Sequence, residues 1–240
     1  MKRSQDSYGI FINNYTAYTT DSGMEAVIGR HAALKVFGDL CGKTVLDFGC
    51  GPATNAESLR KLGVQQIVGI DVNKQELEKA RLLDPAGTYL HYDGIHLANA
   101  VRDYQFDVIF ASFSFCTIED LRVILADMRG MLAEGGELVI IEPNFQRSVG
   151  VHYPGQLHYH GRRYGVIQSG DHMRVTLGEG KDAVKLLHDI YHSHADYQDL
   201  FADAGFTIEI FEEVRPDDTC TEEWAELARK HPPFLLMKAH

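Results

Sequence analysis

Short apolar runs alternate with amphipathic stretches along the first 141 residues of the chain. The runs that predict strands are 44–48, 66–70, 88–91, 106–111 and 137–141. The stretches with apolar residues at helical spacing are 24–40, 53–62, 74–83 and 119–133. Apolar strands that alternate with helices indicate right-handed βαβ units around a parallel sheet covered on both faces.

The pattern changes after Pro143. Residues 144–181 are rich in Gly, His, Tyr and Arg and lack a helical period. They predict two strands around a turn at 168–171 and a third strand at 183–192. Alternating elements then return, and the predicted order is a helix at 193–204, a strand at 206–211, a helix at 222–230 and a strand at 232–240. We therefore expect one domain, 1–240, with a small β-rich cap inserted at 144–192.

Charge and composition exclude several classes of protein. The formal net charge of -11 opposes a nucleic-acid partner. No apolar run approaches the roughly 18 residues that span a bilayer, and the first residues lack a signal-peptide core. The four cysteines, Cys41, Cys50, Cys116 and Cys220, have no metal-site or disulfide-framework spacing. This composition is typical of a soluble cytoplasmic protein with reduced thiols.

The first predicted strand runs into a glycine turn, "VLDFGCGPA". Gly49 and Gly51 can adopt positive φ and lack the Cβ atoms that would keep a ligand off the backbone. Asp71 ends the second strand about twenty residues later, where a carboxylate can accept from both hydroxyls of a ribose. The alternatives are a purely structural turn and a helix cap, respectively. Together the two features predict a nucleoside ligand.

Five ordered segments resemble the motifs of class I S-adenosylmethionine-dependent methyltransferases. They are "VLDFGCGPA", "VGIDVN", "YLHYDG", "FDVIFASFSF" and "MRGMLAEGGELVIIEPN", and "ADYQDLFADAGFTIEI" is similar to a later segment of the family. Ala53 departs from the pattern, since many members carry a third glycine there. The resemblance implies a doubly wound, mostly parallel seven-stranded sheet of Rossmann-like type, whose last strand is antiparallel, and S-adenosyl-L-methionine as cofactor.

The resemblance also implies a role for each residue of the cofactor site. Asp47 would help to hold the cofactor's ammonium group, and Gly49 and Gly51 would approach its methionine part. Asp71 would bind the ribose hydroxyls, and Val72 would pack on the adenine. The remaining positions are Asp93 and Gly94 at the adenine amino group and ring, and Ser112 and Phe113 beside the sulfonium.

The acceptor site is expected above the sulfonium, between the loop after the fourth strand, the cap and an N-terminal lid segment, 1–20. Candidate acceptor-binding residues come from all three regions: Tyr18, Cys116, Tyr153, His158 and Arg163. His192 and Tyr15 are the candidates for orienting or deprotonating the acceptor. His158, His160, His192 and His194 have a spacing that suits a metal, but no cysteine or carboxylate completes the set, so no metal is expected.

These observations predict an enzyme that transfers a methyl group from S-adenosylmethionine to a nitrogen or oxygen of a small molecule. Two alternatives remain open. One is intramolecular alkyl transfer within the cofactor, releasing methylthioadenosine; the other is a non-catalytic cofactor-binding protein. The expected partners are a small-molecule acceptor, without nucleic acid or membrane, and the expected assembly is a monomer or homodimer.

Overall fold

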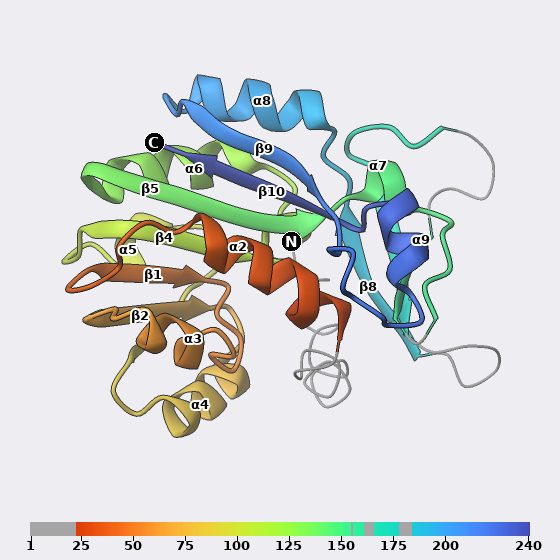
Figure 1. Ribbon diagram of the computed structural model, residues 1–240. Helices are drawn as coiled ribbons and strands as arrows, with labels where there is room; N and C mark the ends of the chain where they lie inside the picture. The colour runs from red at the N-terminus through yellow and green to blue at the C-terminus, as the bar shows by residue number, and fades with distance from the viewer. Residues whose placement is uncertain (1–22, 155, 161–165, 178–183) are drawn as a thin grey trace.

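The computed structural model describes residues 23–154, 156–160, 166–177 and 184–240. Its large sheet contains β1 (Thr44–Phe48), β2 (Gln66–Asp71), β3 (Thr88–His91), β4 (Phe106–Ser112), β5 (Leu132–Pro143), β9 (Ile208–Val214) and β10 (Phe234–Ala239). The seven strands lie in the order β3-β2-β1-β4-β5-β10-β9 (Figure 1). All neighbours are parallel except β10, which is antiparallel to β5 and β9. The predicted doubly wound, mostly parallel seven-stranded sheet, with its last strand antiparallel, is confirmed.

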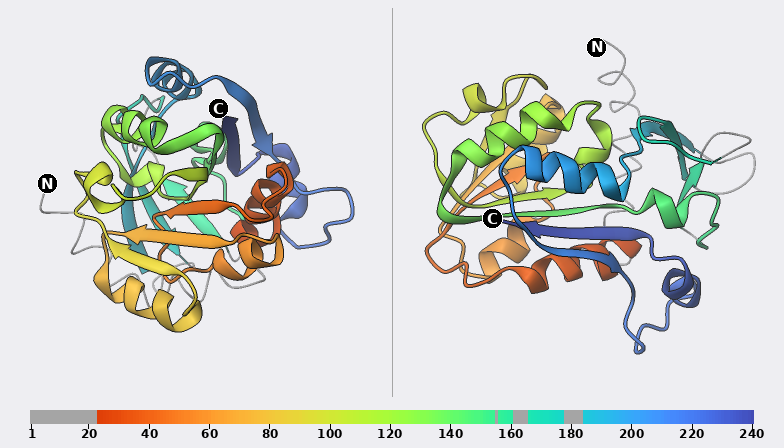
Figure 2. Two further views of the ribbon diagram at one scale, coloured as in Figure 1. Left: turned by 90° about the vertical axis from the view of Figure 1, so that its left-hand side faces the viewer. Right: turned by 90° about the horizontal axis from the view of Figure 1, so that it is seen from above.

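Helices cover both faces of this sheet (Figure 2). One face carries η1 (Glu25–Arg30), α2 (His31–Val36), α3 (Ala56–Lys61), α4 (Lys74–Leu83) and α9 (Ala225–Lys230). The other face carries α5 (Leu97–Ala100), α6 (Leu121–Met131) and α8 (His194–Asp203). Because successive strand residues point to opposite faces, the central strands supply both cores. Val45 and Val108 belong to the first core, and Leu46 and Ile109 to the second.

Local signals set several helix ends. The Ser193 side chain accepts from the backbone N–H of Asp196, whose side chain in turn accepts from Ser193 N, and this capping box starts α8 as the sequence predicts. Gly205 follows the helix with φ of 80°.

The predicted helix at 24–40 is shorter than expected. It is a π-helix through Arg30, then α2, and it ends where Phe37 becomes extended.

A second, antiparallel sheet contains β6 (Leu157–His160), β7 (His172–Leu177) and β8 (Val184–Ile190). It lies beyond the carboxyl ends of the parallel strands, next to α7 (Phe145–Ser148) (Figure 1). We refer to β6-β7-β8 as the cap sheet. The parallel strands thus end beneath a sheet formed by the same chain.

The predicted turn at 168–171 is present, since Asp171 N donates to the carbonyl of Gln168. The first strand of the cap differs from the prediction: residues 166 and 167 are not in a strand, and β6, which pairs with β7, ends at His160. The Asp171 side chain also accepts from the backbone N–H of Gln168, and Gly170 N donates to the carbonyl of Tyr191, just after β8. These bonds fasten the turn to the end of β8. The third predicted strand is confirmed as β8.

In the part of the chain that the structure describes, no helix is long and apolar enough to cross a membrane.

Replacing a buried leucine should cost far more than replacing an exposed one. Leu46 of β1 is 0% exposed, whereas Leu82 of α4 is 82% exposed. Leu46→Ala should lower the free energy of unfolding by about 2–5 kcal/mol, and Leu82→Ala by about 0.5 kcal/mol or less. Urea unfolding of both variants measures the difference. Equal losses would contradict the assignment of β1 to the core.

Candidate active site

The loop after β1 places three alternate residues in left-handed backbone conformations. Gly49 has φ of 70°, Gly51 has φ of 51° and Ala53 has φ of 64°. The third residue therefore adopts the conformation that glycine favours, although it carries a Cβ atom, at a cost of roughly 1–2 kcal/mol. The loop turns the chain sharply at the carboxyl end of the sheet, where open α/β sheets bind their ligands.

Gly49 and Gly51 differ in what surrounds them. A Cβ atom at Gly49 would lie 2.6 Å from Cβ of Ser114, so glycine is required there for packing against the loop after β4. A Cβ atom at Gly51 would meet nothing within 4 Å. Gly51 therefore leaves open space in which a ligand can reach the backbone.

Asp71, at the end of β2, connects two loops. Its Oδ2 accepts from Gly51 N at 2.9 Å, and its Oδ1 accepts from Asn73 N at 2.8 Å. Burial raises the pKa of this carboxyl, and backbone donors at Asn73, Gly51 and Val72 act in the opposite direction. Each oxygen keeps a free acceptor position for a further donor.

Asp47 is 1% exposed beneath the same loop. Asn55 Nδ2 donates to its Oδ1 at 3.2 Å, and the charge of Arg30 also favours the carboxylate. Burial nevertheless raises the pKa of Asp47 to about 7. A ligand cation close to this carboxyl would favour its ionised form.

Val72 and the turn after β3 lie side by side. A Cβ atom at Gly94, which has φ of 83°, would be 3.7 Å from Cγ1 of Val72. The preceding Asp93 is half exposed, and its Oδ1 accepts from the backbone N–H groups of Ile95 and His96. Its other oxygen lies 2.9 Å from His96 Nδ1, and these bonds hold the pKa of Asp93 well below its usual range. The structure thus brings together the three residues predicted at the adenine.

Ser112 ends β4, and Phe113 follows with φ of 53°. The backbone N–H of Phe113 still donates to the carbonyl of Ile141, while its ring packs edge-on against Phe234 at 5.0 Å between centroids. Gly29 of η1 makes room for both rings, since a Cβ atom there would lie 3.2 Å from each. The β4 loop is therefore held between η1 and the start of β10.

Glu142, a residue not predicted from the sequence, organises this loop. The residue is 0% exposed in β5. Its Oε1 accepts from Ser114 N at 2.9 Å and Phe115 N at 2.8 Å, and its Oε2 accepts from Cys116 N at 2.9 Å. Burial raises its pKa to about 7, although the three donors favour the ionised form. The sequence signal that could have revealed Glu142 is an acidic residue inside the apolar run "ELVIIEPN".

Cys116 belongs to η2 (Phe115–Thr117), and His192 contacts Ile118, the residue that follows η2. His192 Nε2 is 2.9 Å from the carbonyl of Ile118, which makes this nitrogen the donor, and burial lowers the pKa of the ring. The side chain is therefore a neutral imidazole at pH 7. Cys116 is buried, and its thiol pKa is raised well above the usual value. Such a thiol is inert as a nucleophile, as the sequence predicts.

Two further predicted residues lie in the cap. The Tyr153 hydroxyl donates to the carbonyl of His231, and the His158 ring stacks on His152 with centroids 3.9 Å apart. Among the described residues, no group of three or more His, Cys, Asp or Glu side chains could hold a metal ion. The remaining candidates, Tyr15, Tyr18 and Arg163, lie outside the described residues, as does the predicted lid at 1–20.

Comparisons with known proteins agree with this geometry. A family model for a methyltransferase domain matches residues 46–140, which contain the β1 loop, Asp71, Asp93 and Phe113. This chain carries a methyltransferase domain of the S-adenosylmethionine-dependent type. The crystal structure of an S-adenosylmethionine-dependent methyltransferase from Mesorhizobium loti has the same fold, with a TM-score of 0.65 at 22% identity, covering 91% of this chain and 98% of that one.

Two known proteins are similar to this chain in sequence, one over most of its length and one over less than half of it. An uncharacterized protein of Haemophilus influenzae is 25% identical over 232 residues, 90% of this chain and 88% of that protein. Ribosomal protein L11 methyltransferase of Photobacterium profundum is 29% identical over 109 residues, 42% of this chain and 34% of that enzyme. The shared part of the latter is less than half of either chain.

The residues at the carboxyl edge of the methyltransferase sheet fit the cofactor. Open space at Gly51 suits a ligand that contacts the backbone. Asp71 has acceptor capacity for hydroxyl donors, and Val72 beside Gly94 offers an apolar surface to a ring. We propose that these residues, with Asp47, hold the cofactor.

Removing the Asp71 carboxylate should weaken cofactor binding. Asp71→Ala should raise the Kd of S-adenosylhomocysteine roughly 5- to 150-fold, because about 1–3 kcal/mol is lost with charge-assisted hydrogen bonds. Isothermal titration calorimetry measures the change. Asp107→Ala is the matched control, since that carboxylate accepts from Thr44 N at the opposite end of β1. A Kd unchanged in Asp71→Ala, or raised equally in Asp107→Ala, would disprove the ribose assignment.

The raised pKa of Asp47 predicts a pH-dependent stability. The unfolded chain releases this proton near pH 3.8, the ordinary pKa of an aspartate, whereas the folded chain keeps it up to about pH 7. The free energy of unfolding should therefore fall as pH rises through this window, by up to roughly 1.4 kcal/mol per pH unit for this group. Urea unfolding without cofactor at pH 5, 6 and 7 should show a smaller decline in Asp47→Asn. An identical slope in both proteins would refute it.

Proposed function

We propose that this methyltransferase acts on a nitrogen or oxygen of a small-molecule metabolite. The observation that carries the proposal is the cap sheet, which covers the carboxyl ends of β4 and β5 (Figure 1). Its strand β8 contacts η2, the segment that directly follows the β4 loop. A protein or nucleic-acid acceptor would have to enter beneath this cover, whereas a small molecule fits there more readily.

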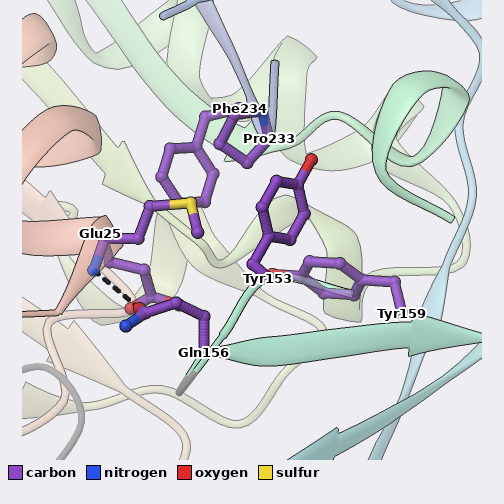
Figure 3. A pocket seen from close by; sticks show the side chains of 7 residues that line it. Glu25, Tyr153, Gln156, Tyr159, Pro233 and Phe234 are labelled. Atoms are coloured by element: carbon purple, nitrogen blue, oxygen red, sulfur yellow. Dashed lines mark hydrogen bonds between the residues drawn. The ribbon is translucent and has the colours of Figure 1, made fainter. Parts of the chain in front are cut away.

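A small cavity of about 20 Å³ lies under the cap, a volume that suits roughly one water molecule. It is lined by Met24, Glu25, Tyr153, Gln156, Tyr159, Pro233 and Phe234 (Figure 3). Phe234 also packs on Phe113, so one aromatic ring separates the cavity from the β4 loop. Met24 N donates to Gln156 Oε1 at 2.8 Å, which closes one side of the cavity. An acceptor larger than water therefore requires η1 or the cap to move.

The bound cofactor supplies an activated methyl group on a sulfonium. The protein has to align the acceptor's lone pair with that carbon and exclude water, and proximity provides much of the acceleration. The β1 loop and Asp71 fix the cofactor side. The β4 loop, held rigidly by Glu142, fixes the side from which the acceptor approaches.

We propose an orienting role for His192. Its Nε2 is occupied by the Ile118 carbonyl, so only Nδ1 is left to accept a hydrogen bond from an acceptor. Burial lowers its pKa, which keeps the ring neutral and ready to accept. Tyr15 remains the second candidate from the sequence.

We also propose that the enzyme acts in the cytoplasm as a monomer or homodimer, without a nucleic-acid or membrane partner. Four free cysteines support a reducing compartment, and the net charge of -11 disfavours nucleic acid.

Methyl transfer can be tested with S-adenosylmethionine labelled in the methyl group. Incubation with a cell extract should place label in molecules that pass a small-pore filter. Label retained with protein or RNA would contradict the small-molecule proposal. Incubation with cofactor alone is the control, since release of methylthioadenosine without acceptor would favour alkyl transfer within the cofactor. A variant lacking Asp71 should lose the label in proportion to its lost cofactor affinity.

A further inference from the structure

Gly29, a buried residue of the π-helix η1, packs against two aromatic rings. A Cβ atom there would lie 3.2 Å from Cζ of Phe113 and 3.2 Å from Cδ2 of Phe234. Its backbone does not require glycine, because its φ lies outside the left-handed region. Alanine is in general the better residue for a helix. The glycine is therefore explained by the space that the two rings occupy.

Phe113 is held in an unfavourable backbone conformation at this contact. Its φ of 53° is left-handed, and in the described part of the chain only Ala53 of the β1 loop is another non-glycine residue with positive φ. Such conformations persist where surrounding contacts enforce them, and they cluster at active sites. The enforcing contacts here are the hydrogen bond from its N–H to the carbonyl of Ile141, the Phe234 ring and Gly29.

Phe113 lies between the cofactor loop and the cavity under the cap. The next residue, Ser114, packs on Gly49 of the β1 loop, at the carboxyl edge of the sheet where open α/β sheets bind their ligands. The Phe113 ring packs on Phe234, which lines the cavity (Figure 3). An acceptor that reaches the cofactor from under the cap therefore meets this ring.

The chain at η1 also bounds the cavity. Met24, the residue directly before η1, lines it together with Phe234. The Met24 backbone N–H donates to Oε1 of Gln156, just before β6, at 2.8 Å. π-Helices are rare and occur frequently at functional sites. The same short segment thus closes the cavity at Met24 and contacts the ring at Gly29.

Resting on the proposed function, we infer that Gly29 is a positioning residue for methyl transfer and acts through the Phe113 ring. Because position 29 carries no side chain, the tip of the ring rests against η1, and this contact fixes the wall along which the acceptor approaches. A methyl group at position 29 would displace the rings by a few tenths of an ångström. The acceptor's lone pair must lie in line with the methyl carbon, so such a displacement lowers the rate of transfer.

Gly29→Ala tests this role, with Gly130→Ala as the matched control. Gly130 lies in the helix α6, where an added Cβ atom would meet nothing within 4 Å. With saturating S-adenosylmethionine labelled in the methyl group, Gly29→Ala should label the acceptors of a cell extract roughly 3- to 10-fold more slowly than the wild-type enzyme. The Kd of S-adenosylhomocysteine should change less than about twofold. Gly130→Ala should match the wild-type enzyme in both measurements.

An unchanged rate in Gly29→Ala would overturn the inference. So would a Kd of S-adenosylhomocysteine that rises in parallel with the loss of rate, because the residue would then act on cofactor binding.

A double-mutant cycle shows whether Gly29 acts through Phe113. Leucine lacks the ring atom that contacts η1, so Phe113→Leu alone should lower the rate roughly 10-fold. Adding Gly29→Ala to that variant should lower the rate less than about twofold further. Equal losses from Gly29→Ala in the two backgrounds would overturn the inference. If Gly29→Ala does not fold, Phe113→Leu still decides, since an unchanged rate in that variant contradicts a role for the ring.

Failure of this inference can be distinguished from failure of the proposed function. Label on protein or RNA would contradict a small-molecule acceptor, but the ratio of the Gly29→Ala and wild-type rates would still test Gly29. If the wild-type enzyme labels no acceptor, the proposed function fails, and a crystal structure of Gly29→Ala tests the positioning role. A Phe113 ring displaced relative to the β1 loop would support that role, and an unmoved ring would overturn it.

Discussion

The arrangement of this methyltransferase site depends on Glu142. Its carboxylate, enclosed in β5, binds three consecutive N–H groups at the end of the β4 loop. Without it these donors would be buried and unpaired, and the loop would lose its conformation. Ser114, the first of the three, packs on Gly49 of the cofactor loop, and Cys116, the last, faces Asp189 of the cap. One side chain thus fixes the cofactor side and the acceptor side relative to each other.

The carboxylate beside the cofactor loop and the carboxylate in the cap differ in their hydrogen bonds. Asp71 is satisfied by two backbone donors and keeps acceptor capacity for a neutral, hydroxyl-bearing ligand. Asp189 is left with an unpaired oxygen in an acidic, apolar enclosure. The first arrangement suits permanent recognition of a ribose. Burial shifts both pKa values upward.

The positions of the parallel strands along the chain were predictable from the sequence because the relevant signals are local, whereas their order in the sheet was not predicted. Apolar runs fixed β1 and β3 to the residue, and the Ser193 capping box fixed the start of α8. The Gly49 and Asp71 signals identified the cofactor edge for the same reason. The roles of Glu142 and Asp189 were not predicted, because the sequence does not show which distant groups donate to a buried acid. Glu142 accepts from three backbone N–H groups more than twenty residues away, whereas Asp189 Oδ1 has no such donor among the described residues. The turn at 168–171 was predicted because its signal is local, whereas the strand paired with β7 lies further back, at Leu157–His160, than the sequence indicates.

A crystal structure with S-adenosylhomocysteine bound would test the central claim most directly. We predict that the ribose hydroxyls donate to Asp71, and that the sulfur lies between the Gly51 backbone and Phe113. A ribose bound away from Asp71, or a sulfur atom remote from Gly51 and Phe113, would contradict this claim.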